Sequence, residues 1–316
     1  MNSTLADTAG EQPRSAAAPH TQKSLGETLI TLVRREFWEH RALWLAPLAV
    51  VGLLVLCAAI GRIHIDLDDA GPVAGEAQRV AVLTIIQWVL AMPLYLVVMC
   101  VTAFYLLDCL YAERKDRSIL FWKSLPVSDE LTVSAKMLVA LVVMPLAVFV
   151  LALAASLLFP VILGGRVLIG SLPPVFTWST YEWARTEIVM LLVTLVAVLW
   201  YAPLAGYLLL VSAWARRAPI LWATLPLVLS PVLEWVAFGT RHLADFINYR
   251  LNGIWWLLGV HNTHIITKHE VKPVGTALAV LNFRGALTSI DLWLGLAVTV
   301  ALVYAAIRIR RYRDDT

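Results

Sequence analysis

The sequence predicts an all-α membrane protein that crosses the bilayer six times. The first observation is composition, because the 316 residues are 60% hydrophobic and only 15% charged, whereas soluble domains are about 45–50% apolar and about 25% charged. The second is a series of long uncharged apolar runs, and the third is the placement of Lys and Arg between alternate runs. These features exclude a water-soluble enzyme and a disordered chain, and three cysteines are too few for a disulfide framework. The net charge of +3 is too small to indicate a nucleic-acid partner.

The predicted spans follow from the length of the apolar runs. A helix needs about 20 apolar residues to cross the hydrocarbon core. Four runs reach that length, and two shorter runs are bounded by charged side chains that can extend to the headgroups. The six predicted spans lie near residues 42–61, 80–107, 137–163, 188–215, 218–238 and 292–307.

The distribution of cationic residues predicts that both termini lie in the cytoplasm. Six spans place the two ends of the chain on the same side. Sixteen of the 25 Lys and Arg residues then fall on that side, as the preference of cations for the cytoplasmic side requires. The basic tail 308–316 would be cytoplasmic, and the long segment 239–291 before the last span would lie outside.

An apolar stretch within this outer segment, residues 243–260, competes with that count. A seventh span here would carry the basic tail to the outer side, and Asp245, Arg250 and Asn252 interrupt the stretch. Tryptophan favours the headgroup level, and Trp255 and Trp256 are adjacent here. We therefore expect an interfacial or re-entrant helix.

The N-terminal region predicts a tail followed by a surface helix. Residues 1–23 are polar and typical of a disordered cytoplasmic tail, and no cleaved targeting signal is evident. Ser24 and Glu27 have the spacing of a capping box, and an apolar stripe runs from Leu25 to Phe37. Residues 24–41 are therefore expected to form an amphipathic helix in the cytoplasmic interface; the alternative is an ordinary start of the first span.

The loop 108–136 carries a pattern that a solvated loop does not need. It is highly charged, yet four consecutive large apolar residues, Ile119–Trp122, lie in its middle. Exposed apolar patches mark interaction sites. Ser128 is placed to cap the following helix, with acidic residues in its first turn. The pattern favours a protein-docking element; the alternative is a loop whose aromatic side chains rest on lipid.

At this loop the sequence resembles ABC type 2 (ABC-2 family) transporter permeases, the membrane subunits of bacterial ATP-driven exporters. The block ERKDRSILFWKSLPVS at 113–128 looks like the cytoplasmic loop of that family, and RREFW at 34–38 is similar to its N-terminal amphipathic helix. The resemblance implies a coupling helix seated in a cleft of a separate ATPase subunit. The residues that would contact that subunit are Glu113, Arg114, Arg117, Leu120, Phe121 and Trp122.

The chain lacks the motifs that catalysis or ATP hydrolysis would need. No Gly precedes a Lys, so there is no P-loop, and we expect ATP and Mg²⁺ to be bound by the partner subunit. His261, His264 and His269 lie in the outer segment, where neutral imidazoles at a spacing of three could bind a transition metal. The neighbouring polar residues instead favour an ordinary wet loop, so we expect no metal site here.

Glu234 is the acid that the predicted spans place inside the membrane. Intramembrane carboxylates are costly and raise a functional hypothesis, so Glu234 is a candidate for gating or for contact with substrate. It also lies near the outer end of its predicted helix, where it could simply reach water.

The leading hypothesis is a non-catalytic permease subunit in the bacterial inner membrane, a homodimer that forms a translocation path and joins two ATPase subunits. One alternative is a membrane-embedded enzyme acting on lipid or isoprenoid substrates, which would need convergent acid, base or metal groups. The other is a secondary transporter, which commonly uses broken, repeated helices. The sequence selects no cargo.

Overall fold

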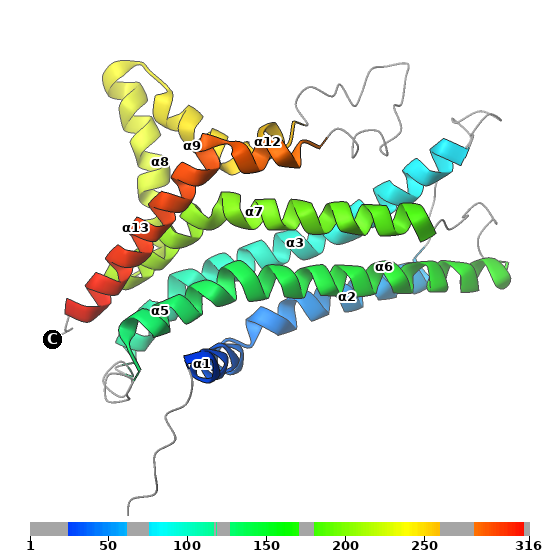
Figure 1. Cartoon of the computed structure of the whole chain (residues 1–316), viewed down its shortest axis with the longest axis horizontal. Helices are drawn as coiled ribbons and strands as arrows, with labels where there is room; N and C mark the ends of the chain where they lie inside the picture. Colours follow the sequence, from blue (N-terminus) through cyan, green and yellow to red (C-terminus); the bar gives the residue numbers. More distant parts are fainter. Residues whose placement is uncertain are drawn as a thin grey trace, which may run out of the picture.

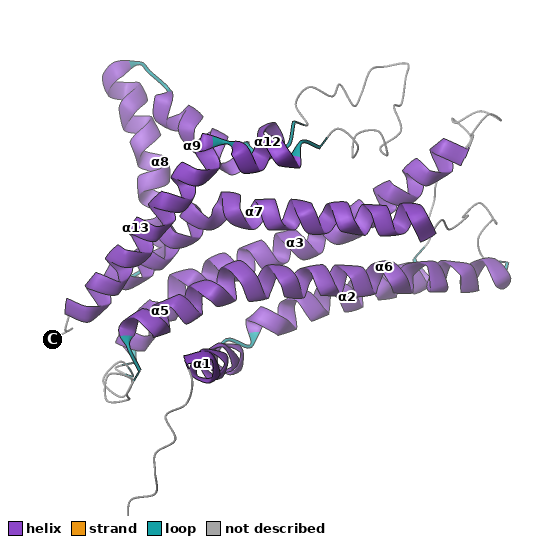
Figure 2. Ribbon diagram, in the orientation of Figure 1, coloured by secondary structure: helices purple, strands orange, loops and turns teal. Residues whose placement is uncertain are grey.

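A computed structural model describes residues 25–61, 76–116, 118, 127–170, 180–259 and 281–312, with only the backbone described for 76–86. Every regular element in these ranges is a helix (Figures 1 and 2). Six helical stretches are long and apolar enough to cross a bilayer. The chain is therefore a multi-pass helical membrane protein, as its composition predicted.

Each of the six predicted apolar runs overlaps one of these stretches. They are α2 (Ala42–Ile60), α3 (Glu76–Lys115), α5–η1–α6 (Asp129–Leu138, Val139–Val143 and Met144–Leu168), α7 (Thr180–Trp214), α8 (Pro219–Phe238) and α13 (Ile290–Tyr312). Several exceed the run that predicted them. For example, α3 continues past Leu107 to Arg114 and Lys115, which complement the negative end of the helix dipole.

The third span contains a local irregularity with an identifiable cause. Residues Val139–Val143 form a π-helical turn between α5 and α6. Pro145 follows in the first turn of α6, and a proline lacks an N–H and clashes with the carbonyl four residues earlier, that of Leu141. The wider π turn accommodates this carbonyl, so the span continues without ending.

The bundle core is formed where α2, α3, α6 and α7 run side by side (Figure 1). The last span, α13, crosses α7 and packs closely on it. A small residue allows this approach, because a Cβ atom on Gly206 would lie 3.3 Å from Cβ of Leu302. Close approach of helices at small residues is the usual way to associate spans within lipid.

Helix α8 stands away from the bundle in Figure 1, and few of its residues are buried. It contains Pro226, which cannot donate to the carbonyl of Trp222. The hydroxyl of Tyr207 on α7 donates to the carbonyl of Ala223 at 2.9 Å and lies 3.5 Å from that of Trp222. A neighbouring helix thus supplies the polar contact that proline removes.

Short helices lie between α8 and α13, where the sequence predicted an interfacial or re-entrant helix. They are α9 (His242–Asn252), α10 (Ile254–Leu257) and α12 (Phe283–Thr288). The indole N–H of Trp200 on α7 donates to the carbonyl of Arg250 at 3.0 Å, and the Arg250 guanidinium lies 4.3 Å from the centre of the Trp200 ring. A cation over an aromatic face is favourable, so α9 is fixed against α7.

The N-terminal helix α1 (Leu25–Glu39) is present where the capping box predicted a helix. It lies beside α5, and the end of α13 also reaches α5 (Figure 1). Both described ends of the chain are therefore at one end of the bundle, the end that also holds the residues flanking 117–126. The side chains that meet there form the candidate site.

Candidate functional site: a buried ionic network at the ends of four helices

The network begins on α1, whose buried side carries Leu32 and, one helical turn later, Glu36. Residues four apart share a face of a helix, so the apolar stripe that docks α1 also directs the Glu36 carboxylate inward. Glu36 is only 2% exposed. An ionised carboxylate at such a position is very unfavourable unless it is paired and hydrogen-bonded.

Lys136 on α5 supplies that partner. Its Nζ donates to both carboxylate oxygens of Glu36, at 2.8 and 3.0 Å, and is itself fully buried. The hydroxyl of Tyr105 on α3 donates to Glu36 Oε2 at 2.9 Å. Three helices therefore converge on one carboxylate, and the ammonium group of Lys136 lies between them.

A second carboxylate, Glu113 near the end of α3, extends the network to the last span. Lys136 Nζ lies 3.1 Å from Glu113 Oε1, and Arg35 Nη2 of α1 lies 3.5 Å from the same oxygen. Arg310 of α13 donates through Nη1 to Glu113 Oε2 and, through Nε at 2.9 Å, to Asp129 at the start of α5. A single set of ion pairs thus joins α1, α3, α5 and α13.

The charges of this ionic network nearly balance. Four acids, Glu36, Glu39, Glu113 and Asp129, face three cations, Lys136, Arg35 and Arg310. Buried pairs of this kind add little net stability compared with well-packed apolar residues, but removing one partner costs about 3–5 kcal/mol because an uncompensated charge remains. The network therefore locks the ends of four helices in fixed relative positions, because the loss of any one partner leaves a buried charge unpaired.

Arg114, adjacent to Glu113, fixes the end of α3 to the end of α7. Its Nη2 donates to the carbonyls of Ser212 at 2.5 Å and Ala215 at 2.8 Å. The Ser212 hydroxyl in turn accepts from the backbone N–H groups of Leu110 and Tyr111, both at 3.1 Å. The carbonyls at a helix C-terminus have no intrahelical donors, and the Arg114 guanidinium satisfies them here.

The structure therefore brings two of the six predicted ATPase-contact residues, Glu113 and Arg114, into intramolecular contacts at the end of α3, which is the root of the loop. Contact between either residue and a partner stays a prediction. The other four residues, Arg117, Leu120, Phe121 and Trp122, lie outside the described residues. Ser128 caps α5 as predicted, since its hydroxyl accepts from Leu131 N at 3.2 Å.

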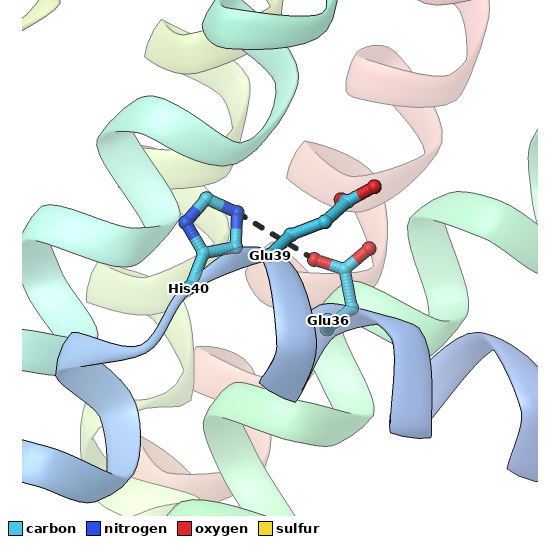
Figure 3. A group of neighbouring side chains, drawn as sticks. All are labelled: Glu36, Glu39 and His40. Atoms are coloured by element: carbon cyan, nitrogen blue, oxygen red, sulfur yellow. Dashed lines mark ion pairs between the residues drawn. The ribbon is translucent and has the colours of Figure 1, made fainter.

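Three side chains beside the network have the proximity of a metal site. The ligand atoms of Glu36, Glu39 and His40 lie within 4.8 Å of one another (Figure 3). However, Lys136 and Tyr105 already bond to Glu36, and Arg35 pairs with Glu39 at 2.7 Å. Protein cations thus occupy the positions in which a metal would be held, and the geometry favours ion pairs. The candidate metal ligands His261, His264 and His269 lie outside the described residues.

His40 closes the network on the side of α2. Its ring meets that of Tyr105 edge to face with centroids 5.0 Å apart, and its Nε2 lies 3.9 Å from Glu36 Oε2. Burial lowers the pKa of His40, and this effect outweighs the opposing influence of the Glu36 carboxylate. The imidazole is therefore neutral at neutral pH and contributes packing, not charge.

Glu234 has partners within its own region of the chain. Oε1 accepts from the Thr240 hydroxyl at 2.7 Å and from His242 N at 2.9 Å, and Oε2 accepts from Leu243 N at 2.7 Å. These backbone donors belong to the first turn of α9, which otherwise lacks acceptors. The position of Glu234 thus gives it a structural role as a cap; gating or substrate contact stays a prediction.

Sequence reasoning missed two features of the site. It did not single out Lys136 or Arg310, although a lysine and an arginine at the ends of apolar runs are candidates for pairing with Glu36 and Glu113. It also missed Glu187, which directly precedes the predicted fourth span and is 5% exposed. The helix begins earlier than that apolar run, so Glu187 lies within the bundle.

These features define a multi-pass α-helical membrane protein whose helix ends are locked by buried ion pairs around one loop. Comparisons of the chain with models of known protein families, with curated proteins and with solved structures found no match.

Proposed function

We propose that this chain is the permease subunit of an ATP-driven exporter resembling ABC type 2 transporters. The observation that carries the proposal is the ionic network, which ties both flanks of the loop 117–126 to other helices. On one flank Glu113 and Arg114 bind α13 and α7; on the other Asp129 and Lys136 bind α13 and α1.

A loop anchored in this way can transmit force. Displacement of the loop by a docked partner would move α3 and α5 together, because charged side chains that are 0–6% exposed cannot separate without leaving buried charges unpaired. The change would reach α1 and α13 through the same ion pairs. Coupling of this kind requires that the state of the partner and the state of the spans bias each other.

The remaining parts of the proposal follow from the cationic residues and the resemblance. The network end of the bundle lies in the cytoplasm of a bacterial inner membrane, and α1 lies in its interface. Two copies of the chain form the translocation path, and each docks a cytoplasmic ATPase subunit that binds ATP and Mg²⁺. The chain itself catalyses no reaction, and its other surroundings are lipid.

The test is co-purification with an ATPase. The tagged chain, co-expressed with an ATPase encoded beside it, is extracted in mild detergent, and the recovered ATPase and its hydrolysis of ATP are measured. The double variant Trp122→Ala/Arg117→Ala is expected to lose most of the associated ATPase. The control is Arg216→Ala/Arg217→Ala, which removes two exposed arginines that follow α7 and should leave association unchanged.

Two results would contradict the proposal. If a well-folded wild-type chain recovers no ATPase, the permease hypothesis is rejected, and a secondary transporter or a membrane-embedded enzyme is favoured. Equal loss of ATPase in both double variants would show that positive charge, and not the loop surface, holds the partner.

A further inference from the structure

A second buried carboxylate group lies at the opposite end of α7 from the ionic network. Glu187 belongs to α7, near its first turns, and is 5% exposed. Ionisable groups buried among membrane-spanning helices are expensive and mark functional positions by default. Unlike the acids of the ionic network, Glu187 is surrounded by neutral polar groups.

The contacts of Glu187 come from α3 and α6. Gln87 Nε2 on α3 donates to Glu187 Oε1 at 3.4 Å, whereas Oε2 is buried and has no hydrogen-bond partner. The Ser156 hydroxyl on α6 lies beside the carboxyl group. That hydroxyl donates its hydrogen to the carbonyl of Leu153 at 2.9 Å and accepts from Trp183 Nε1 at 3.2 Å.

The charged and titratable groups on the surrounding helices do not neutralise this carboxyl group. On α3 the titratable neighbour is Tyr95, whose hydroxyl is 2.8 Å from that of Thr194. On α6, Arg166 donates to the carbonyls of Ala58 in α2 and of Gly61, which follows α2. On α7, Arg185 pairs with Glu182 at 3.5 Å. Among the described residues, no cation forms an ion pair with Glu187.

We propose that Glu187 is a proton-binding site within the membrane domain. Its carboxyl group carries a proton while α3, α6 and α7 are packed together, and it passes that proton to water when the helices separate enough to admit water. Glu187 is so little exposed that a larger ligand would have to displace a helix to reach it, whereas a proton would not. The site does not depend on the proposed ATPase partner.

The surroundings of Glu187 support the protonated form. A proton on Oε2 removes the charge at the oxygen that has no hydrogen-bond partner, while Gln87 still donates to Oε1. The ionised form carries a charge that no described cation pairs with, and unpartnered buried charge is strongly disfavoured.

Infrared spectroscopy of the purified full-length chain in lipid tests the proposal directly. A protonated carboxyl group has a C=O stretching band separate from those of carboxylates and amides. We expect such a band at neutral pH, and we expect Glu187→Gln to remove it. Glu234→Gln should retain the band, because backbone N–H groups donate to Glu234 and favour its ionised form. Ser156→Ala is expected to shift the same band by removing the hydroxyl that lies beside the carboxyl group.

The outcomes separate clearly. Absence of a band that Glu187→Gln removes, at neutral pH and in a sample that remains monodisperse, overturns the proposal. If Glu187→Gln does not fold, the Ser156→Ala shift decides in its place, and an unshifted band counts against Glu187. Failure of ATPase co-purification leaves this result unaffected, so the two proposals fail independently.

Discussion

The two ends of the bundle bury carboxyl groups in opposite ways. At the end that holds α1 and the root of the loop, Glu36 and Glu113 are surrounded by Lys136, Arg310 and Arg35. At the other end, Glu187 is met by a glutamine amide. The same side-chain chemistry is thus compensated by ion pairs in one region and by neutral hydrogen bonds in the other.

The difference teaches that burial alone does not define the role of an intramembrane acid. A carboxylate that is paired with buried cations is hard to move. Breaking one ion pair leaves unpaired charges in the low-dielectric interior, which is costly. A carboxyl group with neutral partners can gain or lose a proton without breaking any ion pair. The first arrangement suits transmission of movement, and the second suits a change of charge.

The largest expected effect breaks the ionic network at its centre. Lys136→Met leaves Glu36 and Glu113 buried without their shared cation and should lower the free energy of unfolding by about 3–5 kcal/mol. Thermal unfolding in detergent measures this loss. Adding Glu36→Gln to Lys136→Met should recover part of the stability; an unchanged melting temperature for Lys136→Met alone would contradict the lock.

The next prediction applies one substitution to both regions. Glu113→Gln removes the charge that faces Arg310 and should cost about 3 kcal/mol, whereas Glu187→Gln replaces a neutral acid by a similar neutral amide and should change stability by less than about 1 kcal/mol. Parallel melting curves compare them. A larger loss for Glu187→Gln would contradict the protonated form of Glu187.

A smaller effect is expected where the two regions are joined by helix packing. Gly206→Val places a side chain against Leu302, where even a Cβ would lie at 3.3 Å, and overpacking of this kind costs about 1–3 kcal/mol. The control is Gly164→Val on α6, where nothing lies within 4 Å of the added Cβ. Equal melting temperatures for the two variants would show that α13 does not depend on this close approach.

The smallest effect concerns His40. Because burial lowers its pKa in the folded state, the unfolded chain binds a proton first as pH falls through about 6.5, and stability declines until pH reaches the lower folded-state value. The neighbouring charges are Glu36, Lys136, Asp108 and Glu39. Melting temperatures between about pH 8 and pH 5 should fall further for wild type than for His40→Gln; parallel curves would contradict this.

The sequence by itself determined the number and approximate position of the spans. An apolar run long enough to cross the bilayer forms a helix, because a helix satisfies the hydrogen bonds of every backbone group within the segment. It also determined that a helix follows residue 24, and it determined the Ser128 cap of α5, because these depend on neighbours within a few residues. The helix predicted at 243–260 is present as α9 and α10, broken at Gly253, where a Cβ would lie 2.2 Å from the carbonyl of Tyr249.

The tertiary structure alone decided which charges meet. Glu36 and Lys136 are 100 residues apart, and Glu113 and Arg310 are 197 apart, so no local pattern could pair them. It likewise extended α7 beyond its apolar run, enclosing Glu187, and made Glu234 a cap for α9. Hydropathy predicts which segments are stable as helices within the bilayer. The partner of a buried charge depends on which helix faces it, and that is decided only when the helices pack together.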